Sequence, residues 1–107
     1  SQAIMVDGVL FTSGQIPLNP ATGSVAGSDI ETQTEQVMRN LSAVLKEAGM
    51  DFENVVKTTC FIANMEYFSA FNQIYSKYFV SKPARSCVEV SRLPKNVLVE
   101  VELIAKK

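Results

Sequence analysis

The chain has 107 residues, a length typical of one domain, and its 10 basic and 11 acidic residues give a formal net charge of -1. Because strong nucleic-acid binding needs a concentrated basic surface, this balance argues against nucleic acid as a partner. The sequence contains no histidine, which excludes Ser-His and Cys-His catalytic pairs and any His-ligated metal, and two isolated cysteines cannot build a zinc site.

No apolar run approaches the roughly 18 residues that span a membrane, and no signal-peptide pattern is found. Cys60 and Cys87 follow no spacing typical of a disulfide framework. We therefore expect a cytoplasmic protein without a membrane partner.

The first predicted elements form a β-hairpin. Residues 4–6 and 9–13 resemble strands and flank Asp7-Gly8, a dipeptide that strongly favours a tight hairpin turn. Residues 17–27 are rich in Pro, Asn, Gly and Ser, which predicts a loop.

A long amphipathic helix follows this loop. Ser28 and Glu31 fit a capping box, in which each side chain bonds the backbone N–H of the other. Gly49 stands where a helix commonly ends in a left-handed residue. The apolar stripe of this helix is Ile30, Thr34, Val37, Met38, Leu41, Val44, Leu45 and Ala48.

A strand over residues 55–63 and a second helix over residues 66–79 are predicted next, with Asn64 as the helix cap. Pro83 prevents further helix. The aromatic stripe of this helix is interpreted as core rather than as a nucleotide-stacking surface; its residues are Phe68, Phe71, Ile74, Tyr75, Tyr78 and Phe79.

Two final strands, residues 84–90 and 97–105, are joined by a turn at 93–96. The order β-β-α-β-α-β-β predicts an α+β fold, with one mostly single sheet and both helices on one of its faces.

The last two strands each have two unlike sides. In the stretch PARSCVEV, residues 83–90, Arg85 and Cys87 alternate with small or apolar residues, and Glu100 and Glu102 oppose an all-apolar row. We expect the face without helices to carry Arg85, Cys87, Glu89, Glu100 and Glu102 mixed with Leu98 and Ile104. This mixture is too apolar for a solvent face and too charged for a dry core, so other subunits are expected to cover it. The charged cluster would then lie in a crevice between chains.

The same residues resemble a known family. PARSCVEV followed by RLPKNVLVEVELIA resembles the C-terminal signature of the RidA/YjgF imine deaminases, and FTSGQIPLNPATG and VVKTTCFIANM resemble two further blocks. The resemblance implies a homotrimer of chorismate-mutase-like fold with sites between subunits. It also implies hydrolysis of 2-imino acids, released by pyridoxal-phosphate enzymes, to 2-keto acids and ammonia without a cofactor.

The resemblance also implies roles for individual residues. Arg85 would bind the substrate carboxylate, and Glu100 would lie near the attacking water. The implied substrate-binding positions are Ser13, Gly14, Asn72 and Cys87. The family usually has Gly-Pro-Tyr before Ser-Gln-Ala, so this single domain of residues 1–107 is expected to lack that tyrosine and the strand preceding it.

Other interpretations remain open at this point. Arg85 could be a structural ion-pair partner of Glu89 or Glu102, and Glu100 could be an exposed strand residue. A nucleophilic role for the Cys87 side chain is disfavoured, because no histidine exists to activate it. The chain could also be a non-catalytic sensor of small carboxylates. Ribonuclease activity is disfavoured by the lack of histidine and of a basic patch.

Overall fold

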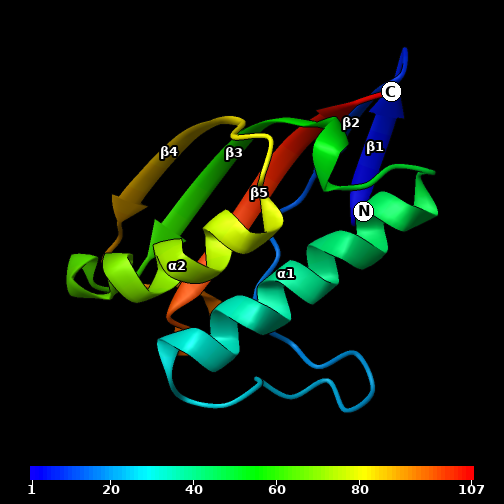
Figure 1. The fold of residues 1–107 in the computed structure, drawn as a ribbon. Helices are drawn as coiled ribbons and strands as arrows, with labels where there is room; N and C mark the ends of the chain where they lie inside the picture. Colours follow the sequence, from blue (N-terminus) through cyan, green and yellow to red (C-terminus); the bar gives the residue numbers. More distant parts are fainter.

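The computed structural model describes all residues, 1–107, and contains the predicted order of strands and helices (Figure 1). The elements are β1 (Ala3–Val6), β2 (Val9–Thr12), α1 (Ile30–Glu47), β3 (Val55–Ile62), α2 (Phe68–Tyr78), β4 (Ala84–Glu89) and β5 (Val99–Lys106). Three short 3-10 turns complete them: η1 (Phe52–Asn54), η2 (Met65–Tyr67) and η3 (Pro94–Asn96).

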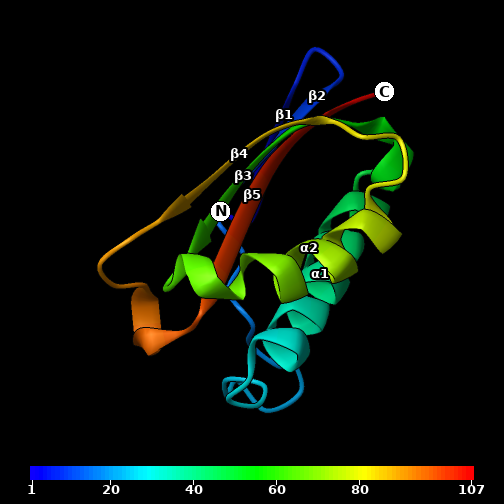
Figure 2. The same ribbon diagram turned by 60° about the vertical axis from the view of Figure 1, so that its left-hand side comes forward.

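The strands form one five-stranded mixed sheet in the order β1-β2-β5-β3-β4. Only β3 and β4 are parallel, and α2 is the crossover that a parallel pair requires. Both helices lie on the same face of the sheet, which Figure 2 shows nearly edge-on. The predicted α+β fold, with two helices on one face of a single sheet, is therefore confirmed.

The hydrophobic core fills the space between the helices and the sheet. Residues alternate between buried and less buried along β3 and β5, as expected for strands with one covered face. The aromatic side of α2 belongs to this core, as predicted: Phe71, Tyr75 and Phe79 are buried, with ring centroids 5.7 and 4.4 Å apart in succession. None of the helices is both long and apolar enough to cross a membrane.

The ends of α1 confirm one prediction and correct another. Gly49 has a left-handed φ of +73°, as predicted. The N–H of Met50 donates to Leu45 O and the N–H of Gly49 donates to Lys46 O, and together these bonds form a Schellman motif. The cap at the other end is Asp29, so the capping box predicted at Ser28 is wrong. The Asp29 carboxylate accepts from both the N–H and the hydroxyl of Thr32, each at 2.9 Å, and a charged acceptor suits the positive helix end.

The start of the second helix also differs from its prediction. Asn64 caps the chain as expected, since its side-chain oxygen accepts from the N–H of Glu66 at 2.8 Å. The capped segment is the 3-10 turn η2, however, and the α-helix begins only at Phe68. Glu89 explains part of this geometry, because its carboxylate accepts from the N–H of Met65 at 2.7 Å.

The predicted shared face for Arg85, Cys87 and Glu100 is wrong. Register pairs Arg85 with Thr58 and Cys87 with Cys60, and residues paired this way point to the same side of a sheet. Thr58 and Cys60 are buried under the helices, so Arg85 and Cys87, with Glu89 next in the same alternation, lie on the helix side. Alternation within one strand divides its residues into two faces but does not say which face the helices cover.

The face without helices carries a mixture of apolar and acidic side chains. β5 contributes Glu100 and Glu102 to it, because each alternates with buried core residues. The same alternation and register place exposed apolar residues there; they are Ile4, Val6, Phe11 and Val88. The chain therefore leaves uncovered a surface that is more apolar than a typical solvent face.

Candidate functional site

Arg85 lies on the edge strand β4 and is held by the side chains of α2. Its Nη1 donates to Asn72 Oδ1 at 2.6 Å, and its guanidinium carbon lies 4.5 Å from the Tyr75 ring centroid and 5.3 Å from that of Phe68. Stacking of this kind contributes about 0.5–1 kcal/mol at an exposed site. The contacts fix the plane of the guanidinium and use only one of its five N–H donors.

No carboxylate of the chain pairs with Arg85. The ion pair that the structure contains joins Lys77 and Glu35 at 3.5 Å, so the ion-pair interpretation of Arg85 is wrong within one chain. An exposed, oriented guanidinium without an internal anion is suited to bind a carboxylate ligand through two parallel hydrogen bonds.

Below Arg85, a buried polar contact joins α2 to β3. The hydroxyl oxygens of Tyr75 and Thr58 are 2.7 Å apart, and burial raises the pKa of Tyr75, which keeps the phenol neutral. This bond fixes the ring on which the guanidinium stacks. A cavity of about 540 Å³ opens beside it, and its charged lining residues, Arg85 and Lys82, are both cations.

Cys87 follows Arg85 by two residues and is half-buried beside the fully buried Cys60. A hydrogen bond with the Cys60 thiol, assisted by the charge of Arg85, lowers the pKa of Cys87 to about 7 despite its partial burial. The same hydrogen bond, together with burial, raises the pKa of Cys60.

Glu100 belongs to a second cluster, built where the chain after β2 runs beside β5. Two hydrogen bonds between the backbones of Gln15 and Val101, at 2.8 and 3.1 Å, hold the two segments together. They bring Gly14 so close to Glu100 that an added Cβ would lie 1.8 Å from Glu100 Oε2. The absence of a side chain at Gly14 therefore permits this position of the Glu100 carboxylate, whereas the backbone angles of Gly14 do not call for glycine.

The environment of Glu100 favours its neutral form more than water does. Partial burial, and to a smaller extent the neighbouring Glu102 carboxylate, raises the pKa of Glu100 above its usual value. Ser13, one residue before Gly14, is exposed, and its hydroxyl donates to Ser1 O at 2.7 Å. The Glu100 carboxyl group thus lies against the Gly14 backbone, and Ser13 precedes this glycine in the chain.

The six predicted site residues therefore fall into two half-sites. The arginine half-site is Arg85, Asn72 and Cys87, and the glutamate half-site is Glu100, Ser13 and Gly14. Arg85 and Glu100 point to opposite faces of the sheet, so one chain cannot bring both to one ligand. No group of three or more His, Cys, Asp or Glu side chains is arranged to hold a metal ion.

The sequence interpretation missed the support beneath Arg85. Tyr75 and Phe68 were assigned wholly to the core, although both also contact the guanidinium. The spacing from Phe68 to Asn72 and Tyr75, four and then three residues, places all three on one side of a helix, a signal that could have linked the aromatic residues to the asparagine.

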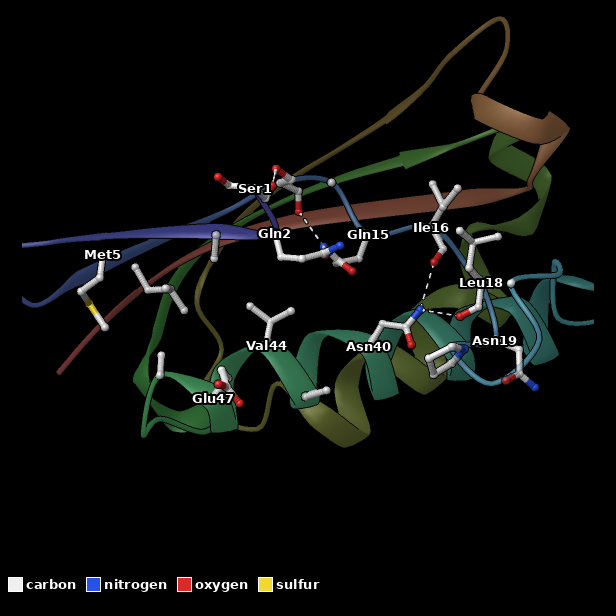
Figure 3. Close-up of a pocket in the computed structure, with 18 residues that line it drawn as sticks. Ser1, Gln2, Met5, Gln15, Ile16, Leu18, Asn19, Asn40, Val44 and Glu47 are labelled. Carbon is white, nitrogen blue, oxygen red and sulfur yellow. Dashed lines mark hydrogen bonds between the residues drawn. The ribbon is translucent and has the colours of Figure 1, made fainter.

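A larger cavity than the one beside Arg85 lies between the β1–β2 hairpin and α1 (Figure 3), with a volume of about 1270 Å³. Asn40 stabilises one end of it by donating to Ile16 O and Leu18 O at 3.1 and 3.0 Å. Glu47 is the one charged side chain in its lining, so the cavity offers no side-chain cation for a carboxylate. It contains Ser13 and Gly14 of the predicted residues but neither Arg85 nor Glu100.

Comparisons with known proteins agree with the resemblance noted in the sequence. The family model described as Endoribonuclease L-PSP matches residues 1–107. AldR of Lactococcus lactis subsp. lactis, named as a candidate regulator, is 61% identical over 106 residues, which cover 98% of this chain and 84% of AldR.

Solved structures are similar over the whole fold. YyfA of Yersinia pestis, a Rid-family protein of unknown function, is 53% identical with a TM-score of 0.97, over 100% of this chain and 86% of that one. Escherichia coli TdcF with bound serine is 36% identical with a TM-score of 0.94, over 99% of this chain and 86% of that one.

Proposed function

We propose that this chain, which belongs to the Endoribonuclease L-PSP (YjgF/RidA/RutC) family, hydrolyses 2-imino acids to 2-keto acids and ammonia. The observation that carries the proposal is the state of Arg85. Its guanidinium is exposed, oriented by Asn72 and Tyr75, and without an internal carboxylate partner. A small acid can supply the missing anion.

The substrate class is supported by the ligand of a similar protein. The TdcF structure contains serine, an amino acid whose carboxylate is next to a carbon that carries nitrogen. A 2-imino acid has the same arrangement, with a C=N bond at that carbon. An arginine that fixes the carboxylate would therefore place the C=N carbon at a constant distance from the guanidinium.

The complete site requires a second chain. Because the two half-sites lie on opposite faces of the sheet, the arginine half-site of one subunit would meet the glutamate half-site of its neighbour in a homotrimer. The exposed apolar residues on the same face of the sheet as Glu100 supply a surface for this contact. Light scattering that gives the mass of a monomer at micromolar concentration would contradict this assembly.

The proposed reaction uses water and the Glu100 carboxylate. Glu100 accepts a proton from a water molecule, whose oxygen forms a bond to the carbon of the protonated imine. The resulting tetrahedral adduct receives that proton on its nitrogen, which makes Glu100 a carboxylate again. The C–N bond then breaks and ammonia leaves, while Glu100 accepts the proton of the adduct hydroxyl, whose oxygen becomes the keto oxygen. Glu100 finally passes this proton to the released ammonia, which leaves as ammonium. General acid–base catalysis of this kind contributes roughly 10²- to 10⁴-fold in rate.

The other site residues would position the substrate. Backbone groups around Cys87 and Gly14 can approach the ligand closely, and the Ser13 hydroxyl can bond the carboxylate. The Cys87 side chain is not required as a nucleophile, because each step above is balanced by Glu100 and water.

A second candidate function is suggested by the name of AldR: a sensor that binds small carboxylates and regulates a partner. It would need the arginine half-site but not the glutamate. Endoribonuclease activity, which the family description names, finds less support, because the chain has no histidine and a net charge of -1.

The test combines a rate and a binding measurement. Ammonia and 2-ketobutyrate are measured from freshly generated 2-iminobutanoate with wild type and Glu100→Gln, and calorimetry measures 2-ketobutyrate binding to both. We expect the variant to bind the keto acid normally but to hydrolyse the imine at least 100-fold more slowly. Binding without any acceleration by wild type would instead favour the sensor. A second preparation with Gly-Pro-Tyr ahead of Ser1 tests the tyrosine implied by the family resemblance.

A further inference from the structure

The two cysteines of the chain are direct neighbours on parallel strands. Cys60 of β3 is paired in register with Cys87 of β4, and both point to the helix side of the sheet. Neighbouring strands lie about 4.7–4.9 Å apart. This spacing falls within the range of about 4.4–6.8 Å between Cα atoms that a disulfide can span. Both thiols are free in this structure.

The two thiols differ in access and in neighbours. Cys87 is half-buried on the edge strand, whereas Cys60 is fully buried beside it on β3, with its sulfur 3.9 Å from Thr58 Oγ1. Arg85, two residues before Cys87 on the same side, stabilises a thiolate there. Such a pair resembles a redox-sensitive cysteine next to a resolving cysteine.

We propose that Cys87 is a peroxide-sensitive modification site and that Cys60 resolves its oxidation by forming an intramolecular disulfide. This inference goes beyond the proposed hydrolysis and does not depend on it. Its three supports are the register of the strands, the unequal burial of the thiols and the cation beside Cys87.

The chemistry proceeds in two balanced steps. The Cys87 thiolate attacks one oxygen of hydrogen peroxide, the O–O bond breaks, and hydroxide leaves and takes up a proton as water; the product is a sulfenic acid. The Cys60 sulfur then attacks Cys87 Sγ, the S–O bond breaks, and hydroxide leaves with the Cys60 proton as a second water. Two thiols lose two electrons in total, and the peroxide gains them. A dithiol reductant reverses the change.

The disulfide would alter the arginine half-site. It removes the negative charge that the Cys87 thiolate places near Arg85, and it links the edge strand β4 covalently to its inner neighbour β3. Because a direct attack on Cys60 is hindered by its burial, oxidation has to begin at Cys87.

Peptide mapping tests the disulfide. The protein is treated with hydrogen peroxide near neutral pH, free thiols are blocked with iodoacetamide, and the protein is digested with trypsin without reductant. Cleavage after Lys57, Lys77, Arg85 and Arg92 places the cysteines in separate peptides, 58–77 and 86–92. We expect these two peptides to be linked in most molecules, with the intact chain lighter by two hydrogen atoms.

Two variants separate the roles of the thiols. Cys60→Ala should trap the sulfenic acid at Cys87, so that labelling by dimedone rises at least fivefold over wild type. Cys87→Ser should leave Cys60 unoxidised under the same treatment. Circular dichroism confirms that each variant is folded, and Cys60→Ser replaces Cys60→Ala if that variant is not. Sulfinic acid at Cys87 of wild type without linked peptides, or a Cys87–Cys87 link between chains, would overturn the proposal.

Discussion

The contact between Gly14 and Glu100 allows the glutamate half-site to be disturbed by a single methyl group. In Gly14→Ala the added Cβ would lie 1.8 Å from Oε2, 2.7 Å from Cδ and 3.0 Å from Cγ of Glu100, whereas ordinary contact begins at 3.4 Å. The carboxylate must therefore move by about 1.6 Å. Gly14 has no positive φ, so alanine causes no backbone strain, and the group that moves is the end of a flexible side chain.

This displacement is expected to lower the rate much more than the stability. A misplacement of about 1 Å in a reacting group can reduce catalysis roughly 100-fold, which corresponds to about 2.7 kcal/mol in activation free energy. The free energy of unfolding should change by less than about 1 kcal/mol, since replacement of glycine by alanine at an unstrained position is often slightly stabilising.

A double-mutant cycle measures whether the effect acts through Glu100. kcat/KM for 2-iminobutanoate is compared in wild type, Gly14→Ala, Glu100→Ala and the double variant, and urea denaturation gives the stability of each. With the carboxylate removed, Gly14→Ala should change kcat/KM by less than about twofold. An equal loss in both backgrounds, or a Gly14→Ala enzyme as fast as wild type, would refute the reasoning.

Three further predictions concern single groups. Arg85→Lys should lower kcat/KM by a factor that corresponds to a loss of about 2–5 kcal/mol of transition-state stabilisation, because lysine keeps the charge but loses the planar fork. The circular dichroism spectrum should stay unchanged. A near-wild-type kcat/KM would contradict carboxylate binding by Arg85. The pKa of Glu100 is raised, and its carboxylate form is the proposed base. On acidification the rate should therefore begin to fall at a pH above the usual pKa of glutamate. Glu100→Gln should lack this acid limb in a pH profile. Thr34→Val should raise the free energy of unfolding in urea by about 1 kcal/mol, because the fully buried Thr34 hydroxyl has no hydrogen-bond partner; a loss of stability would indicate an unseen partner.

Local patterns in the sequence predicted most elements correctly, because each depends on residues close together in the chain. The stripe of α1, the Asp7-Gly8 turn and Gly49 at the helix end are of this kind. The cap at Asp29 instead of Ser28 shows the limit of such patterns, since a shift by one residue preserves the helix but exchanges the capping group.

The arrangement of the site depended instead on pairings between distant segments. Which face Arg85 occupies is set by its register with Thr58, and strand alternation is equally compatible with either face. The approach of Gly14 to Glu100 follows from the bridge between Gln15 and Val101, for which the sequence carries no local signal. The family resemblance could name these residues but not their division between two faces.

That division has a consequence for the genetics of the protein. In the proposed ring, an Arg85→Lys subunit still carries an intact glutamate half-site, and a Glu100→Gln subunit still carries an intact arginine half-site. Two alleles that are each inactive should therefore complement one another when co-expressed. Random mixing in equal amounts would give about a quarter of the sites one intact half from each parent, because each half is intact with a probability of one half. A chain carrying both changes could not complement either allele in this way, so the position of a second mutation decides whether function is rescued.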